Sequence, residues 1–180
     1  MRILIGLVVL AVALPASANM LTNGSFEDGM NGWSGGPSRI DADQYNPDPA
    51  TLDGAHKAGD SNCNARASST YQSVSATGPV TLTGGLAGGD AGGYTYYVKL
   101  WDGAVGGTLL GQKVLSGINN WQLFSLSGTA TGTVTVEFGS TGAGQWGPVG
   151  FHVDALDLTP EPASMALFAL AGLPLLRRRR

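Results

Sequence analysis

The stretch TVTVEF, residues 133–138, alternates polar and apolar side chains with a period of two. Successive side chains of a β-strand point to opposite faces, so this pattern predicts a strand with one face in the core and the other in water. The expected buried set is Val134, Val136 and Phe138. The expected solvated set is Thr133, Thr135 and Glu137.

The stretch YTYYVKLW, residues 94–101, shows the same alternation with larger side chains. A strand here would again separate its side chains into two sets. The inner set is Tyr94, Tyr96, Val98 and Leu100. The outer set is Thr95, Tyr97, Lys99 and Trp101.

Further short runs rich in β-branched and aromatic residues lie between glycine-rich breaks, and no amphipathic window of helical period exceeds about two turns. They are STYQSVSA (69–76), PVTLTGGL (79–86), TLLGQKVL (108–115), WQLFSLSG (121–128) and VGFHVDALDL (149–158). Short strands at near-regular spacing are typical of sandwiches and barrels. The sequence therefore predicts an all-β body formed by a single antiparallel β-sandwich.

Residues 1–18 have the layout of a secretory signal peptide. One early cation, Arg2, precedes an apolar run over 3–14, and the small residues Ala16, Ser17 and Ala18 follow. Cleavage after Ala18 would make Asn19 the first residue of a protein exported by a bacterium of the Gram-negative type.

The C-terminal end is a second apolar segment. Residues 163–176 are 14 uncharged residues, which would span about 21 Å as a helix, whereas a membrane helix needs about 20 residues. A cluster of cations follows and favours a cytoplasmic end through the positive-inside rule. The cluster is Arg177, Arg178, Arg179 and Arg180.

Pro160, Glu161 and Pro162 stand directly before this segment. A Pro-Glu-Pro motif, an apolar segment and terminal arginines resemble the PEP-CTERM sorting signal, here residues 160–180. The resemblance implies an apolar sorting helix that holds the protein transiently in the inner membrane. It also implies processing by an exosortase, a membrane protease that acts near the motif. The alternative is an ordinary tail anchor.

The body that remains, residues 19–159, is long enough for one domain with a substantial core. It carries five Lys and Arg residues and twelve Asp and Glu residues, so its formal charge is 5 − 12 = −7. Because phosphate binding needs a basic patch, this charge disfavours nucleic acid as a partner. The single cysteine, Cys63, excludes an intrachain disulfide.

Several stretches of the body together resemble a galactose-binding-like β-sandwich of the jelly-roll type, the group that includes carbohydrate-binding modules. They are NMLTNGSFEDGMNGWS (19–34), YQSVS (71–75), YTYYVKLWDG (94–103), WQLFSLSG (121–128) and FHVDALDL (151–158). The resemblance implies that the first and last strands lie close together.

The resemblance also implies a structural calcium ion, with Glu27 and Asp154 at positions where relatives often hold one. Calcium takes six to eight oxygen ligands, so carboxylates from both ends of the chain would clip the termini together. The alternative is that Glu27 caps a loop and Asp154 accepts hydrogen bonds from nearby backbone. The acid-rich stretch 41–54 starts like an EF-hand but lacks its turn glycine and terminal glutamate, which favours a solvated loop.

Exposed aromatic side chains with polar neighbours are the features that a glycan site needs, because sugar rings pack on flat aromatic faces. Trp101, with Tyr97 and Lys99 on the same strand face, fits this description first. Trp33 and Trp146, in glycine-rich sequence, are the next candidates. Trp121 opens a strand and is expected to pack in the core.

No catalytic motif is found: the sequence has no Gly-x-Ser-x-Gly, no His-Glu-x-x-His and no phosphate loop with its lysine. We therefore expect a non-enzymatic surface or biofilm-matrix protein whose partners are an exosortase and exopolysaccharide or another glycan. Two alternatives remain open. One is a purely structural matrix protein without a glycan ligand, and the other is a glycan hydrolase with two opposed carboxyl groups.

Overall fold

The computed structural model describes residues 18–36, 38–41, 49–61, 67–89, 94–117, 119–142 and 150–161. Within it, Ala18–Glu161 form one compact unit. The predicted signal peptide up to residue 17, the sorting signal from Pro162 onward, Cys63 and Trp146 lie outside the described residues. In the described part of the chain, no helix is long and apolar enough to cross a membrane.

The described chain is all β and every strand pair is antiparallel, which confirms the predicted fold class. The strands are β1 (Ser34–Gly36), β2 (Arg39–Ile40), β3 (Ala58–Ser61), β4 (Ser68–Gly89), β5 (Thr95–Asp102), β6 (Thr108–Ser116), β7 (Asn119–Thr141) and β8 (Gly150–Pro160). Their order in the sheet is β2-β3-β8-β4-β7-β5-β6, and β1 also pairs with β4.

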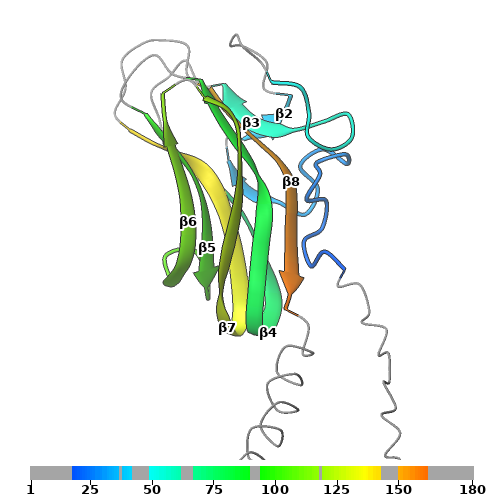
Figure 1. Cartoon of the computed structure of the whole chain (residues 1–180), viewed down its shortest axis with the longest axis vertical. Coiled ribbons are helices and arrows are strands. Elements are labelled where there is room, and N and C mark those ends of the chain that lie inside the picture. The colour runs from blue at the N-terminus through cyan, green and yellow to red at the C-terminus, as the bar shows by residue number, and fades with distance from the viewer. Residues whose placement is uncertain are drawn as a thin grey trace, which may run out of the picture. The chain divides into compact units, whose positions relative to one another are not determined.

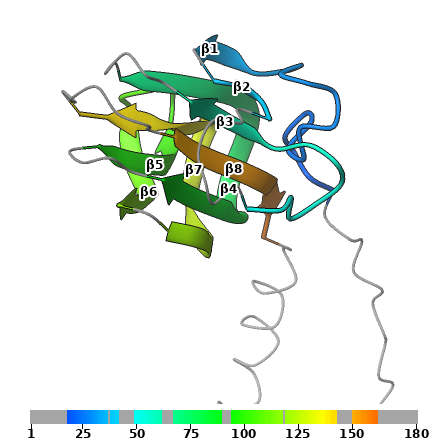
Figure 2. The same cartoon turned by 90° about the horizontal axis from the view of Figure 1, so that it is seen from above.

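Two long strands, β4 and β7, organise the fold and lie side by side in Figure 1. On its other edge the second part of β4 pairs with β8, whereas the second part of β7 pairs with β5. Each long strand thus belongs to both layers of a sandwich, and from above the strands curl around a common interior (Figure 2). Tyr96 of β5 faces Phe151 of β8 across this interior, with ring centroids 5.7 Å apart.

The sequence predicted two strands where each of these long strands runs without a break. The expected break between residues 76 and 79 is instead part of β4, where Gly78 pairs with Ala130 and Pro79 with Thr129 of β7. Gly78 has a φ of 96°, which a side chain would resist, so the turn residues bend the strand without ending it. Local glycine and proline therefore mark the place where the chain passes from one layer to the other.

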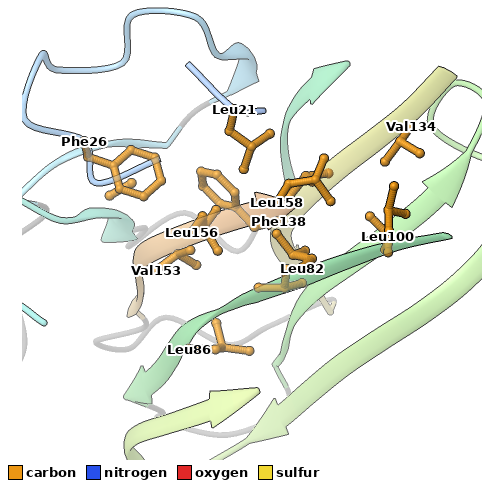
Figure 3. Close-up of a cluster of buried hydrophobic side chains, with 14 of the residues drawn as sticks. Leu21, Phe26, Leu82, Leu86, Leu100, Val134, Phe138, Val153, Leu156 and Leu158 are labelled. Carbon is orange, nitrogen blue, oxygen red and sulfur yellow. The ribbon is translucent and has the colours of Figure 1, made fainter. Parts of the chain in front are cut away.

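The inner side chains of the two key stretches are buried as predicted. Figure 3 shows Phe138 of β7 among leucines of β4 and β8 and Val134 beside Leu100 of β5, while Leu21 and Phe26 come from the N-terminal segment. The prediction for the opposite face of β7 is wrong in part. Thr135 and Glu137 are 0% and 4% exposed, because side chains of neighbouring strands lie over them.

The N-terminal segment lies along the free edge of β8, close to it as the resemblance implied, but residues 23–27 form turns and not the opening strand that was expected. The Asn19 side chain forms hydrogen bonds with the backbone of β8 that a neighbouring strand would otherwise form. Its Nδ2 donates to the Leu156 carbonyl oxygen at 2.8 Å, and its Oδ1 accepts from the Leu158 amide at 3.0 Å. The Met20 amide also donates to the Leu158 carbonyl oxygen. Since an open strand edge exposes unpaired amides and carbonyls, this segment protects the last strand.

Candidate functional site

One side of the layer formed by β1, β4, β7, β5 and β6 carries most of the predicted glycan-binding residues. Cross-strand pairing arranges it in three rows, which we call the outer face. The first row is Ser69, Gly139, Tyr97 and Val114; the second is Tyr71, Glu137, Lys99 and Gln112; the third is Ser73, Thr135, Trp101 and Leu109.

Glu137 is the centre of a hydrogen-bond network on this face. Its Oε1 accepts from the Ser69 hydroxyl at 2.7 Å and lies 3.0 Å from the Tyr97 hydroxyl. Its Oε2 accepts from the Trp101 indole N–H at 2.8 Å. A buried carboxylate is costly unless it is hydrogen-bonded, and donors to a charged acceptor form short, strong bonds. The network therefore fixes the two aromatic side chains around the carboxylate.

Tyr97 lies across β7 and is 5% exposed. Its hydroxyl also reaches the carbonyl oxygen of Ser68 on β4, 3.1 Å away. This path exists because Gly139 has no side chain: a Cβ there would overlap the Ser68 carbonyl oxygen and lie 3.0 Å from the Tyr97 hydroxyl. Burial, and next the charge of Glu137, raise the pKa of Tyr97, so its hydroxyl stays protonated. Tyr97 therefore packs beneath the outer face and exposes little of its ring for a ligand to contact.

Trp101 and Lys99 lie above this support. Trp101 is partly buried and its indole N–H is held by Glu137, which fixes the ring. The Lys99 ammonium lies 4.0 Å from the centroid of the Tyr97 ring and 5.5 Å from that of Trp101, within cation–π range. Tyr71, which is 37% exposed, lies across the row on β4. The outer face thus offers fixed aromatic side chains beside hydroxyl, amide and ammonium groups.

Sequence reasoning missed the parts played by Glu137, Tyr71 and Ser69. Alternation assigned Glu137 to water, since it says which face a residue occupies but not what neighbouring strands place over it. The signal that could have found it is the register between strands, which puts Lys99 directly opposite Glu137.

The other tryptophans have different surroundings. Trp33 packs against the core, with its ring centroid 5.4 Å from that of Phe26 and 5.0 Å from that of Phe138. Its part in glycan binding stays a prediction. Trp121 was expected to pack in the core, but it is not part of the main core cluster. Its indole N–H donates to the Ala50 carbonyl oxygen at 2.7 Å, and its ring is next to Gly85.

The two predicted calcium ligands come together on one loop. Glu27 Oε1 accepts from the amides of Ala55 and His56, each at 2.8 Å. Asp154 Oδ2 accepts from the amides of Leu52 and Asp53, at 2.6 and 3.2 Å. The two carboxylates therefore hold residues 52–56 between them, and we call this arrangement the loop clamp.

Asp154 is completely buried, and its Oδ1 accepts a third amide, that of Ala155, at 2.6 Å. Burial raises the pKa of Asp154, and the hydrogen bonds from the backbone of Asp53, Leu52 and Ala155 oppose that rise. Ala155 has a φ of 54°, next to an irregularity in the pairing of β8 with β4. This local distortion was not visible in the strand periodicity.

The donor groups around the loop clamp do not suit a cation. Calcium is bound by oxygen atoms, whereas the groups facing Glu27 Oε1 and both oxygens of Asp154 are amide N–H donors. Within the described residues, no three His, Cys, Asp or Glu side chains gather where they could hold a metal ion. The residues fit the alternative interpretation, backbone capping, while calcium stays a prediction.

No family model and no curated protein matches the chain. Among solved structures, "Family 16 Carbohydrate Binding Module-2" is similar at 18% identity and a TM-score of 0.55, covering 78% of this chain and 99% of that one. TmCBM61, solved with β-1,4-galactotriose, is 18% identical with a TM-score of 0.57, covering 81% of this chain and 100% of that one.

The structure titled "CBM4 structure and function" is 14% identical with a TM-score of 0.51, covering 78% of this chain and 99% of that one. Enzymes also contain similar domains: the match to MgGH51 α-L-arabinofuranosidase, at a TM-score of 0.56, covers 26% of that chain. At such identities the likeness is one of fold. The structural neighbours of this chain are thus carbohydrate-binding modules, and its body has their β-sandwich fold.

Proposed function

We propose that this chain is an exported, non-catalytic bacterial protein that associates with glycans through the outer face. The observation that carries the proposal is the network in which Glu137 holds Trp101 and Tyr97 on a sandwich resembling carbohydrate-binding modules. A ring that is already fixed loses little conformational freedom when a sugar packs on it. Tyr71 and Gln112, in the same row as Glu137, supply polar groups for sugar hydroxyls.

Such a face gives weak contacts, and weak contacts suit a protein displayed in many copies. A polysaccharide repeats the same unit along its length, so several molecules of the protein bind one polymer and the combined affinity exceeds that of each face. This is the function we propose within an exopolysaccharide matrix. In the alternative, a purely structural matrix protein, no glycan would bind the outer face.

The proposed location outside the cell rests on the two ends of the sequence. The sorting motif follows the body without a linker: Pro160 ends β8, and the Glu161 amide donates to the Pro79 carbonyl oxygen at 3.0 Å. We expect the protein recovered from cells to have a mass that lacks residues 1–18 and the segment after the motif. A mass that includes the arginine cluster would instead indicate a simple tail anchor.

Glycan binding is tested by titrating the parent and a Trp101→Ala variant against the ligands found with a glycan array. We expect the variant to lose at least about tenfold in affinity, which is about 1.4 kcal/mol, because the stacking ring is removed. Trp121→Ala is the matched control, since it removes a partly buried tryptophan from the other layer. Equal binding by the Trp101 variant and the parent would refute the proposed site.

A further inference from the structure

The outer face carries a single ammonium group, that of the partly buried Lys99. Of its described residues, only Lys99 carries an ammonium group and only Glu137 a carboxyl group, and Glu137 is buried under its hydrogen-bond partners. The remaining positions are hydroxyl, amide, aromatic, aliphatic or glycine residues. A ligand on this face therefore meets one ammonium group and no exposed carboxylate, although the body as a whole is acidic.

Lys99 does not form an ion pair with its cross-strand neighbour. Glu137 lies directly opposite on β7, yet its carboxylate and the Lys99 ammonium are not joined by an ion pair. Three neutral donors already occupy the Glu137 carboxylate. The Lys99 ammonium instead lies over aromatic rings, 4.0 Å from the centroid of Tyr97. Its N–H donors are consequently left for a ligand.

The same position makes the ammonium an obstacle to a neutral sugar. A sugar ring that packs on Trp101 from the side of Lys99 displaces the ammonium and so loses its cation–π contacts without replacing the charge. A sugar that carries a carboxylate or sulfate compensates this loss, since it accepts charge-assisted hydrogen bonds from the displaced ammonium. The arrangement therefore discriminates between ligands by their charge.

We infer that the outer face selects glycans bearing an anionic group, a uronate carboxylate or a sulfate ester, and that Lys99 pairs with it; this inference rests on the proposed function. In the same row Gln112 is next to Lys99, and Tyr71 lies beyond Glu137. Four strands at about 4.8 Å spacing make this row about 14 Å wide, the reach of a short oligosaccharide. The acidic body repels a long polyanion elsewhere, which confines attraction to this face.

The test is calorimetric titration of the purified full chain with four probes. Tri-galacturonate and its methyl ester share a backbone and differ in charge, so they test recognition of a carboxylate. A sulfated galactan oligosaccharide and neutral β-1,4-galactotriose test recognition of a sulfate ester in the same way. At low salt we expect the acid to bind at least about fivefold more tightly than its ester. We expect added salt to reduce the difference, because an exposed ion pair is screened.

Variants assign this preference to Lys99. Lys99→Gln is expected to bring the ratio of the two affinities close to one, and Lys99→Arg to keep it. Lys113→Gln is the matched control, because Lys113 pairs with the core residue Val98 and lies on the opposite side of the sheet; it should leave the ratio unchanged. Circular dichroism checks that each variant is folded.

The outcomes separate the two claims. Binding of the neutral probes as tight as that of the anionic ones overturns the inference and leaves the proposed function standing. An equal loss of preference in Lys113→Gln also overturns it, since the effect would then come from net charge. If no probe of either charge binds, the inference and the proposed function fail together.

Discussion

Glu137 shows how one residue organises a surface. Its carboxylate is buried, and it holds side chains from β4 and β5 through three hydrogen bonds. Sequence periodicity placed this glutamate on the correct side of its strand but in the wrong environment. The reason is physical: burial of an outward side chain depends on the length and direction of its neighbours across the sheet, which one strand does not encode.

The substitution Glu137→Gln tests the network. A glutamine keeps the shape but turns an N–H₂ group toward Trp101 or toward Ser69 and Tyr97, which are themselves donors. An unsatisfied buried donor costs about 1–3 kcal/mol, so we expect the free energy of unfolding in urea to fall by that amount. Asp157→Asn, an equal charge change at an exposed position of β8, should stay within about 0.5 kcal/mol. Equal stability of the two variants would contradict the network.

At the level of elements, the fold depends on two strands that each serve both layers. Hydrophobic alternation within β4 and β7 was readable from the sequence, and the inner residues Val134, Val136 and Phe138 were correctly assigned. Their continuity was not readable, because Gly78-Pro79 has the composition of a turn although it is paired as strand. Turn residues report local backbone freedom, while strand pairing depends on residues far away in the chain.

Gly139 of β7 gives the sharpest test at this level. Gly139→Ala would place a methyl group against the Ser68 carbonyl oxygen and the Tyr97 hydroxyl, so we expect a loss of about 1–3 kcal/mol in the free energy of unfolding. Gly132→Ala on the same strand meets open space and should change stability by no more than about 0.5 kcal/mol. Chemical denaturation measures both, and matching values would disprove the close crossing of Tyr97 over β7.

The loop clamp leads to a different prediction. Since Glu27 and Asp154 already accept backbone amides, we expect the melting temperature of the full chain to be the same with excess EDTA as with millimolar calcium. Asp154→Asn should lower the melting temperature in both buffers, because its amide nitrogen cannot accept the loop amides. A melting temperature that rises with calcium and falls with chelator would support the calcium site that the sequence predicts.

For the whole molecule, the sequence predicted the fold class and named some of the residues that the structure brings together in the candidate site. Composition, alternation and the resemblance led to the sandwich, and they named Trp101, Tyr97 and Lys99 together. They did not reveal that Tyr97 is a buried support, nor that Tyr71 shares the face, because both facts depend on the register between β4, β7 and β5. The proposed location outside the cell rests on the sequence of the two ends, of which the structure describes Ala18, Pro160 and Glu161.

The central claim is that the outer face binds glycans, and the indole N–H groups of the tryptophans report on it separately by NMR. On titration with a glycan that the full chain binds, we predict that the Trp101 indole signal shifts, because its ring meets the sugar, while the Trp121 signal on the other layer stays in place. A Trp121 signal that shifts while the Trp101 signal does not move would contradict the account.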